Sequence, residues 1–174
     1  MVSKPSRDYS GRFPSPLAIS MTPIGVVRSP HVERHGTPRQ PEVSGEREQR
    51  ECLSASIVLN EAVIGPESLQ DLEGFDRIWA LGYFHLNQGW KAQVVPPRGP
   101  RVKRGLLSTR APHRPNGIAL SCCRLLRVEG LTLHLGPCDL LDGTPILDIK
   151  PYLPFADAFP GARAGWVDEL SERS

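Results

Sequence analysis

The sequence lacks the short motifs by which many enzyme families hold a nucleotide, a nucleophile or a metal. It contains no G-x-G-x-x-G, no G-x-x-x-x-G-K-[ST], no G-x-S-x-G and no H-E-x-x-H. His31 and His35 are four residues apart, but they stand among prolines, where a helix is not expected to align them. We therefore expect no metal site, and no dinucleotide or nucleoside triphosphate cradle.

The chain also lacks long apolar runs and paired cysteine motifs. Its longest apolar run, around Trp79–Leu86, falls well short of the ~20 residues that span a bilayer. The start of the chain, residues 1–16, is polar and has no signal-peptide core. No C-x-x-C occurs among the four cysteines, which are Cys52, Cys122, Cys123 and Cys138. These features predict small buried thiols in a reducing compartment and a cytoplasmic protein without a membrane partner.

Proline and glycine are abundant, with 18 and 16 residues of 174, and they disfavour a bundle of long helices. The 39% hydrophobic content still allows a packed core. One helix is expected, over Glu67–Glu73 after Gly65-Pro66. Strands are expected over Ile24–Arg28, Cys52–Leu59, Ile78–Leu86, Gln93–Val95, Leu106–Thr109, Ile118–Val128, Leu131–Leu135 and Ile146–Ile149. The prediction is a mainly β fold: a small antiparallel β-barrel, which leaves no open edges, with one or two short helices.

Three regions are expected along the chain. Residues 1–20 read as a flexible leader, and residues 21–160 as the barrel domain. Residues 161–174 form a short tail, in which Ala164–Leu170 is either a short helix or disordered. The clearest hairpin joins two runs at Glu129-Gly130; there Leu131, Leu133 and Leu135 alternate with polar residues, as in a half-buried strand.

Charge is distributed unevenly, although the formal net charge is only +2. Between Arg77 and Val128 there are ten Lys or Arg residues and no Asp or Glu. The rest of the chain holds 11 basic and 19 acidic residues. Solvated surface strands are one explanation, and an anion-binding face for nucleic acid, phosphate or a carboxylate is the other.

Several proline-stiffened clusters follow one another in an order that resembles a known family. These are Ile24–Pro30, Pro38–Gln40, Leu72–Phe75 with Ile78-Trp79, Phe84-His85, Thr109–Asn116, Asp139–Pro145 and Asp148–Tyr152. Together they resemble the TsaA-like (TrmO) family, whose members use S-adenosylmethionine to methylate N6 of threonylcarbamoyl-adenosine 37 in tRNA. The resemblance covers about Thr22–Pro154 and implies a barrel that forms a homodimer, with the cofactor near the subunit interface.

Residues that match the family's motifs are implied to bind S-adenosylmethionine. They are Pro38, Arg39, Gln40, Phe84, His85, Arg110, Leu120, Asp142, Gly143, Thr144 and Pro145. Arg39 or Arg110 suits the cofactor carboxylate, and Asp142 suits the sulfonium. Leu120 and the 142–145 turn suit the adenine. Ordinary turn chemistry at Asp142-Gly143 and a barrel-interior role for His85 remain alternatives.

The implied reaction passes a methyl group from sulfur to N6, and it is assisted by removal of the N6 proton. His85, His113 and Asp142 are candidates for that base, and no dedicated base is the alternative. The anticodon loop of tRNA is the implied RNA partner, because exposed loop bases are the usual target of sequence-specific RNA recognition. Its phosphates would meet the basic stretch at Arg98, Arg101, Lys103, Arg104 and Arg114.

The sequence departs from the family pattern in one loop. The family reads Arg-Pro-Asn-Pro-Ile-Gly-Leu-Ser where this chain has Gly117 and Ala119 in place of the second proline and the glycine. We expect a looser loop at Gly117 and less space beside the cofactor at Ala119. The family's tRNA enzymes also continue into a C-terminal domain beyond the region of resemblance, so cofactor binding transfers more safely than the tRNA substrate. The other functions considered are methylation of another RNA or a small molecule, and a non-catalytic cofactor sensor or RNA-binding module.

Overall fold

The structure is a computed structural model and describes residues 19–33, 54–97 and 99–171. Strands dominate these residues, and the helices among them are short. The strands are β1 (Gly25–Arg28), β2 (Ser54–Leu59), β3 (Arg77–Tyr83), β4 (Gln93–Val94), β5 (Arg104–Gly105), β6 (Ile118–Glu129), β7 (Thr132–Pro137) and β8 (Pro145–Pro151). The short helices are η2 (Pro66–Leu69), η3 (Leu72–Gly74), η4 (Leu106–Ser108), α1 (Pro154–Asp157), η5 (Gly165–Val167) and α2 (Asp168–Ser171).

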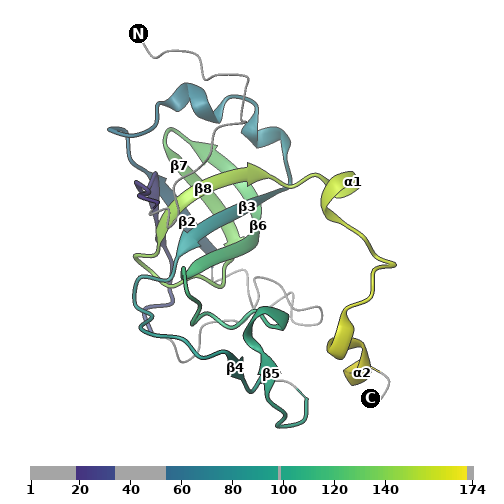
Figure 1. The fold of residues 1–174 in the computed structure, drawn as a ribbon. Helices are drawn as coiled ribbons and strands as arrows, with labels where there is room; N and C mark the ends of the chain where they lie inside the picture. The colour runs from purple at the N-terminus through teal and green to yellow at the C-terminus, as the bar shows by residue number, and fades with distance from the viewer. Residues whose placement is uncertain (1–18, 34–53, 98, 172–174) are drawn as a thin grey trace, which may run out of the picture.

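Six strands close into an antiparallel barrel in the order β1-β2-β7-β6-β3-β8, with β8 returning to β1 (Figure 1). The register places Val27 opposite Ile57 between β1 and β2, and Ala80 opposite Ser121 between β3 and β6. The two remaining strands, β4 and β5, form a separate small hairpin below the barrel (Figure 1). The predicted mainly β barrel is confirmed.

The barrel interior holds one hydrophobic core, to which every barrel strand contributes. Val27, Ile57, Ile78, Leu133 and Ile146 are completely buried. Because side chains alternate between the two faces of a strand, the inward positions of β6 include Ala119 and Cys123. The predicted alternation in β7 is confirmed, since Leu133 and Leu135 are buried and the intervening His134 is not.

Two elements differ from their predicted type. The expected strand over Leu106–Thr109 is wrong, because Leu106–Ser108 forms the 3₁₀ turn η4. Hydroxyl groups stabilise this turn: Ser108 Oγ donates to the carbonyl of Gly105, and Thr109 Oγ1 donates to that of Leu106. Such local side-chain bonds compete with strand pairing. Leu106 is thereby buried while Leu107 is 81% exposed.

The helix expected over Glu67–Glu73 is present only in part, as two short 3₁₀ helices in place of one α-helix. It divides into η2 and η3 at Asp71, whose φ of 65° lies in the left-handed region. A seven-residue segment has little helical stability of its own. The break lets both Leu69 and Leu72 pack against the barrel core.

Strand boundaries shift by a few residues from those expected. β3 ends at Tyr83 rather than at Leu86, because the chain turns at Phe84, whose carbonyl accepts a hydrogen bond from the amide of Asn87. β7 and β8 extend beyond the predicted ends, to Pro137 and Pro151. Cys52 and Leu53 lie outside the described residues, as does the predicted leader up to residue 18.

After the barrel, the chain returns along its outside to the β4–β5 hairpin. Asp157 Oδ2 accepts hydrogen bonds from Trp79 Nε1 at 2.9 Å and from the Leu153 amide at 2.8 Å. Trp166 Nε1 donates to the carbonyl of Ser108 at 2.8 Å. The short tail helix predicted over 164–170 is present as η5 and α2.

The three described cysteines form no disulfide. The Sγ atoms of Cys123 and Cys138 lie 3.9 Å apart inside the barrel. In the part of the chain that the structure describes, no helix has the length and apolar character needed to cross a membrane.

Candidate functional site at one end of the barrel

The predicted cofactor segments gather at the barrel end where β1 and β3 finish and β6 and β8 begin. We call this the site end. Three loops follow or precede these strands there: residues 29–33, 84–87 and 109–117. The turn 138–144 joins β7 to β8 at the same end. Antiparallel pairing therefore unites segments that are more than 100 residues apart in the sequence.

Backbone hydrogen bonds hold the turn 138–144 against β1. The amide of Val27 donates to the carbonyl of Thr144, and the amide of Gly143 donates back to the carbonyl of Val27, both at 2.9 Å. The amide of Asp142 donates to the carbonyl of His31 at 2.8 Å. Gly143 has a φ of 76°, a conformation that favours glycine. The turn is thus a rigid part of the barrel wall.

The Asp142 carboxylate also faces β1. Its Oδ1 accepts a hydrogen bond from the Ser29 amide at 3.1 Å, and its Oδ2 lies 3.7 Å from Nη1 of Arg28. These contacts give Asp142 a clear role in holding the turn against β1. Its predicted part in catalysis stays a prediction.

Thr144, the last residue of this turn, and Ala119 of β6 are buried inside the barrel. They are 4% and 2% exposed. A Cβ placed on Gly82 would lie 3.2 Å from Thr144 Cγ2 and 3.6 Å from the Ala119 methyl group. Ala119 therefore fills interior space against β3, where the absence of a side chain at Gly82 makes room for Thr144.

Phe84 and His85 lead out of β3 beside the 109–117 loop. The Phe84 amide donates to the carbonyl of Gly117 at 2.7 Å, and Phe84 packs against the core. His85 is exposed. Gly117 has a φ of 55°, which proline, the family's residue, cannot adopt. This loop therefore enters β6 by a backbone path that the family's proline would not permit.

The two arginines of this loop have different surroundings. Arg114 Nη1 donates to the carbonyl of Thr109 at 3.0 Å, and the carbonyls of Leu106 and Ala111 lie 3.5 Å from it. Arg114 therefore closes the loop on itself. Arg110 is exposed, and no hydrogen bond or ion pair to another described residue holds its guanidinium. It remains available to an anion.

A partly buried polar pair that the sequence motifs did not indicate lies next to Arg110. Ser121 Oγ, on an inward position of β6, donates to Asp139 Oδ1 at 2.6 Å. Burial raises the pKa of the Asp139 carboxyl, whereas the Ser121 hydrogen bond and the positive charge of Arg110 act to lower it. Ser121 is a polar residue between two inward-facing apolar residues of β6. A polar residue at an inward position is the sequence signal by which this pair could have been found.

His31 is a second residue without an assigned role at the site end. Its Nε2 atom is buried, and no described residue forms a hydrogen bond with it. Pro38, Arg39 and Gln40, which the resemblance assigns to the cofactor, lie outside the described residues. His113 is partly buried within the 109–117 loop.

Leu120 does not point toward the 142–145 turn of its own barrel. It is 60% exposed on the outer face of β6, next to the exposed Ile118 and paired with Leu81 of β3. Tyr83, paired with Ile118, is 45% exposed on the same face. We call Leu81, Tyr83, Ile118 and Leu120 the outer patch.

The predicted RNA-binding residues also divide into two kinds. Arg101 and Lys103 are exposed at the tip of the β4–β5 hairpin. Arg104 stacks over Trp166 at 5.2 Å and lies 3.5 Å from Oε2 of Glu169, so the tail already occupies it. Arg98 lies outside the described residues.

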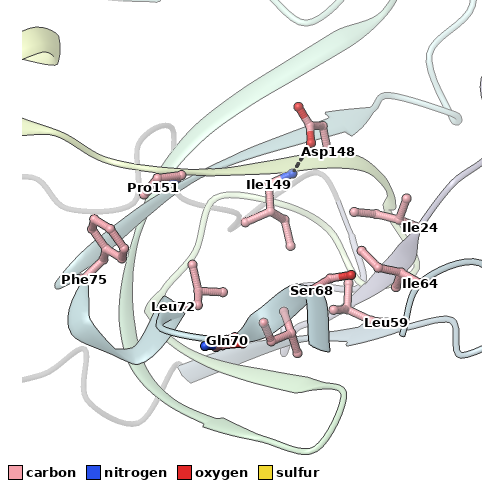
Figure 2. Close-up of a pocket in the computed structure, with 11 residues that line it drawn as sticks. Ile24, Leu59, Ile64, Ser68, Gln70, Leu72, Phe75, Asp148, Ile149 and Pro151 are labelled. Carbon is pink, nitrogen blue, oxygen red and sulfur yellow. Dashed lines mark hydrogen bonds between the residues drawn. The ribbon is translucent and has the colours of Figure 1, made fainter. Parts of the chain in front are cut away.

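A cavity of about 270 Å³ lies at the opposite end of the barrel (Figure 2). It is lined mainly by apolar side chains of β2, η2, η3, β8 and the segments beside them, including Ile24, Leu69 and Phe75. Asp148 stands at its border, where its Oδ1 accepts a hydrogen bond from the Ile149 amide (Figure 2). None of the predicted cofactor residues that the structure describes lines it.

Residues 26–158 match the model of the tRNA-methyltransferase O N-terminal domain. The chain belongs to this family. The matched range contains the barrel apart from Gly25, the first residue of β1, and it contains every described segment at the site end.

Individual relatives agree with this membership. The chain is 41% identical over 151 residues to the tRNA (adenine(37)-N6)-methyltransferase of Escherichia coli, covering 83% of this chain and 62% of that protein. It is 42% identical over 139 residues to the human enzyme of the same name, covering 78% and 30%. A crystal structure of TrmO from Pseudomonas aeruginosa superposes with a TM-score of 0.68 at 38% identity, covering 86% and 62%. The chain thus spans less than two thirds of these relatives.

Proposed function

We propose that this protein is an S-adenosylmethionine-dependent methyltransferase that acts on N6 of adenine 37 in tRNA. The nucleoside that it modifies would be threonylcarbamoyl-adenosine. One observation carries the proposal: the barrel brings Phe84-His85, Arg110 and the 142–145 turn to a single end. The names of the relatives supply the reaction class. The proposed tRNA substrate agrees with the cytoplasmic location that the sequence predicts.

The described residues fit S-adenosylmethionine, which supplies an activated methyl group on a sulfonium when bound. Arg110 offers an uncommitted guanidinium that pairs well with a carboxylate. The cofactor has no phosphate, so it needs no glycine-rich anion cradle. The rigid turn at Gly143 and Thr144 offers backbone groups at the edge of the barrel for the adenine and ribose.

Catalysis in this proposal rests chiefly on positioning. Residues at the site end would hold the cofactor's methyl group next to N6, which would convert an encounter of two molecules into a step within one complex. The N6 proton leaves as the new bond forms, to a nearby base or to water. His85 and His113 flank the site on the two loops beside Gly117, and both remain candidates for this proton transfer.

The RNA would be held by the acid-free stretch between Arg77 and Val128. Arg101 and Lys103 are exposed on a hairpin that projects from the site end (Figure 1). Phosphate contacts from such residues supply affinity and orientation without reading the sequence. The anticodon loop, which carries position 37, is the partner that this arrangement fits.

We further propose that two copies associate through the outer patch. Leu120 matches a family cofactor residue, yet its side chain lies on the outside of its own barrel. A second copy packed against the outer patch would bring Leu120 of one subunit to the cofactor of the other. An apolar surface over two paired strands, at Leu81 and Ile118 among others, is also typical of an interface.

The deciding experiment measures transfer of a labelled methyl group to whole tRNA from cells that lack the enzyme. Label is expected in adenosine 37 of threonylcarbamoylated tRNA and not in unmodified tRNA. Calorimetry with S-adenosylhomocysteine tests the cofactor separately. Label found only in small molecules would contradict the tRNA substrate, and binding without transfer would indicate a sensor. An absence of any cofactor binding would contradict the methyltransferase proposal altogether.

A further inference from the structure

His31 is held firmly at the site end by its backbone. Its amide donates to Ser29 Oγ at 3.1 Å, and its carbonyl accepts the Asp142 amide at 2.8 Å. Ser29 in turn donates its amide to Asp142 Oδ1. The histidine is therefore clamped between the end of β1 and the turn that carries Gly143 and Thr144.

The side chain of His31 is incomplete in its hydrogen bonding. Its Nε2 atom is buried from solvent and has no hydrogen-bond partner among the residues that the structure describes. Buried polar atoms in folded proteins almost always have a partner, so an unpaired one calls for a physical explanation. An imidazole nitrogen donates or accepts according to its tautomer, and it can therefore serve either kind of polar group on a ligand.

We propose that His31 is a further cofactor-binding residue, whose Nε2 forms a hydrogen bond with a polar atom of bound S-adenosylmethionine or S-adenosylhomocysteine. This inference rests on the proposed function. It adds a residue from the loop after β1 to a site that the family motifs assign to other segments. The turn 138–144 connects His31 with those segments: its Asp142 amide donates to the His31 carbonyl, and the turn carries residues assigned to the cofactor.

The test compares four variants by calorimetry with S-adenosylhomocysteine. His31→Phe keeps a ring of similar size without the nitrogen, and His31→Ala removes the ring; each is expected to weaken binding about tenfold. His31→Gln carries a polar group near the Nε2 position and is expected to lose less than threefold. His134→Phe is the matched control: His134 bonds to Glu129 at the far hairpin, and binding is expected to be unchanged.

A second measurement reads the nitrogen directly. Addition of S-adenosylhomocysteine to ¹⁵N-labelled protein is expected to shift the His31 Nε2 resonance and leave that of His134 in place. The inference is overturned if His31→Phe binds like the wild type, if the Gln variant loses as much as the Phe variant, or if the resonance does not move. If the wild type itself fails to bind, the proposed function falls and this inference falls with it; normal binding by the wild type and His31→Phe overturns the inference alone.

Discussion

Ser121 donates a hydrogen bond of 2.6 Å to Asp139 across the inside of the barrel end, joining β6 to the segment that follows β7. The pair places an ionisable group beneath Arg110 in a largely buried position. Burial penalises the ionised form of the carboxyl, while the hydroxyl and the arginine favour it. The balance leaves the pKa of Asp139 raised above its ordinary value.

This raised pKa predicts a definite pH dependence of stability. A group whose pKa is higher in the folded state stabilises the fold fully below its unfolded pKa, and this contribution is lost as the pH rises through the folded pKa. Asp139→Asn is uncharged throughout and keeps the acceptor for Ser121. It is expected to unfold at higher denaturant concentration than the wild type at pH 7, and the difference should vanish near pH 3.

Asp157→Asn provides a comparison of opposite sign. Hydrogen bonds from the Leu153 amide and Trp79 lower the pKa of Asp157, so its contribution is present above the unfolded pKa and is lost as the pH falls. This variant is expected to lose stability at neutral pH. A loss of stability at pH 7 in Asp139→Asn would show that the charge of Asp139 supports the fold, contrary to this account.

Arg110→Ala is expected to weaken binding of S-adenosylhomocysteine by about 2 kcal/mol or more, because a charged hydrogen-bond partner of the carboxylate is lost. Calorimetry measures the dissociation constant. Arg127→Ala is the control, since Arg127 lies at the other end of the barrel beside Glu129. An unchanged dissociation constant in Arg110→Ala would remove this residue from the cofactor site.

Gly117→Ala is expected to cost about 1–2 kcal/mol of unfolding free energy, the usual penalty for a side chain in the left-handed region. A Cβ there would also lie 3.2 Å from Tyr83 Cε2. Gly161→Ala is the matched variant, because a Cβ at Gly161 meets open space. Chemical denaturation of both variants provides the measurement, and equal stability would contradict the conformation assigned to Gly117.

Glu169→Gln is expected to strengthen RNA binding, because it weakens the hold of the tail on Arg104. If the released guanidinium meets one further phosphate, the salt dependence should steepen by about 0.7–0.9 in the slope of log K against log salt concentration. Filter binding or fluorescence anisotropy with tRNA over a salt series measures both. Glu67→Gln, an exposed change at the opposite barrel end, should have no effect. Identical curves for Glu169→Gln and the wild type would show that Arg104 does not contact RNA.

Leu120→Glu is expected to convert dimers into monomers and to weaken cofactor binding at the same time, since the outer patch is proposed to serve both. Analytical ultracentrifugation gives the oligomeric state. Leu126→Glu places the same charge at an exposed position of the same strand, near its other end, and should leave the dimer intact. A monomeric wild type would contradict the proposed interface.

The sequence by itself indicated a small antiparallel barrel and the approximate positions of its strands along the chain, whereas the order of the strands around the barrel came from the structure. Alternating apolar residues such as Leu133 and Leu135 specify a strand with one buried face, and strands of this kind can bury those faces by closing on one another. Motif order also identified the family, because side chains such as Arg110 and Asp142 stand at recognisable distances from fixed proline and glycine residues.

Tertiary structure decided what the individual polar groups at the site end do. The partners of Asp142 lie 113 residues away in the sequence at Ser29, and those of Asp139 lie across the barrel at Ser121. The contacts of Arg104 also depend on the tertiary structure, because its partner Glu169 lies in the tail. At Leu106–Ser108, hydrogen bonds from the Ser108 and Thr109 hydroxyl groups stabilise a turn where a strand was expected. Local sequence sets which face of an element is apolar, but the partner, burial and pKa of a polar side chain depend on segments that only folding brings together.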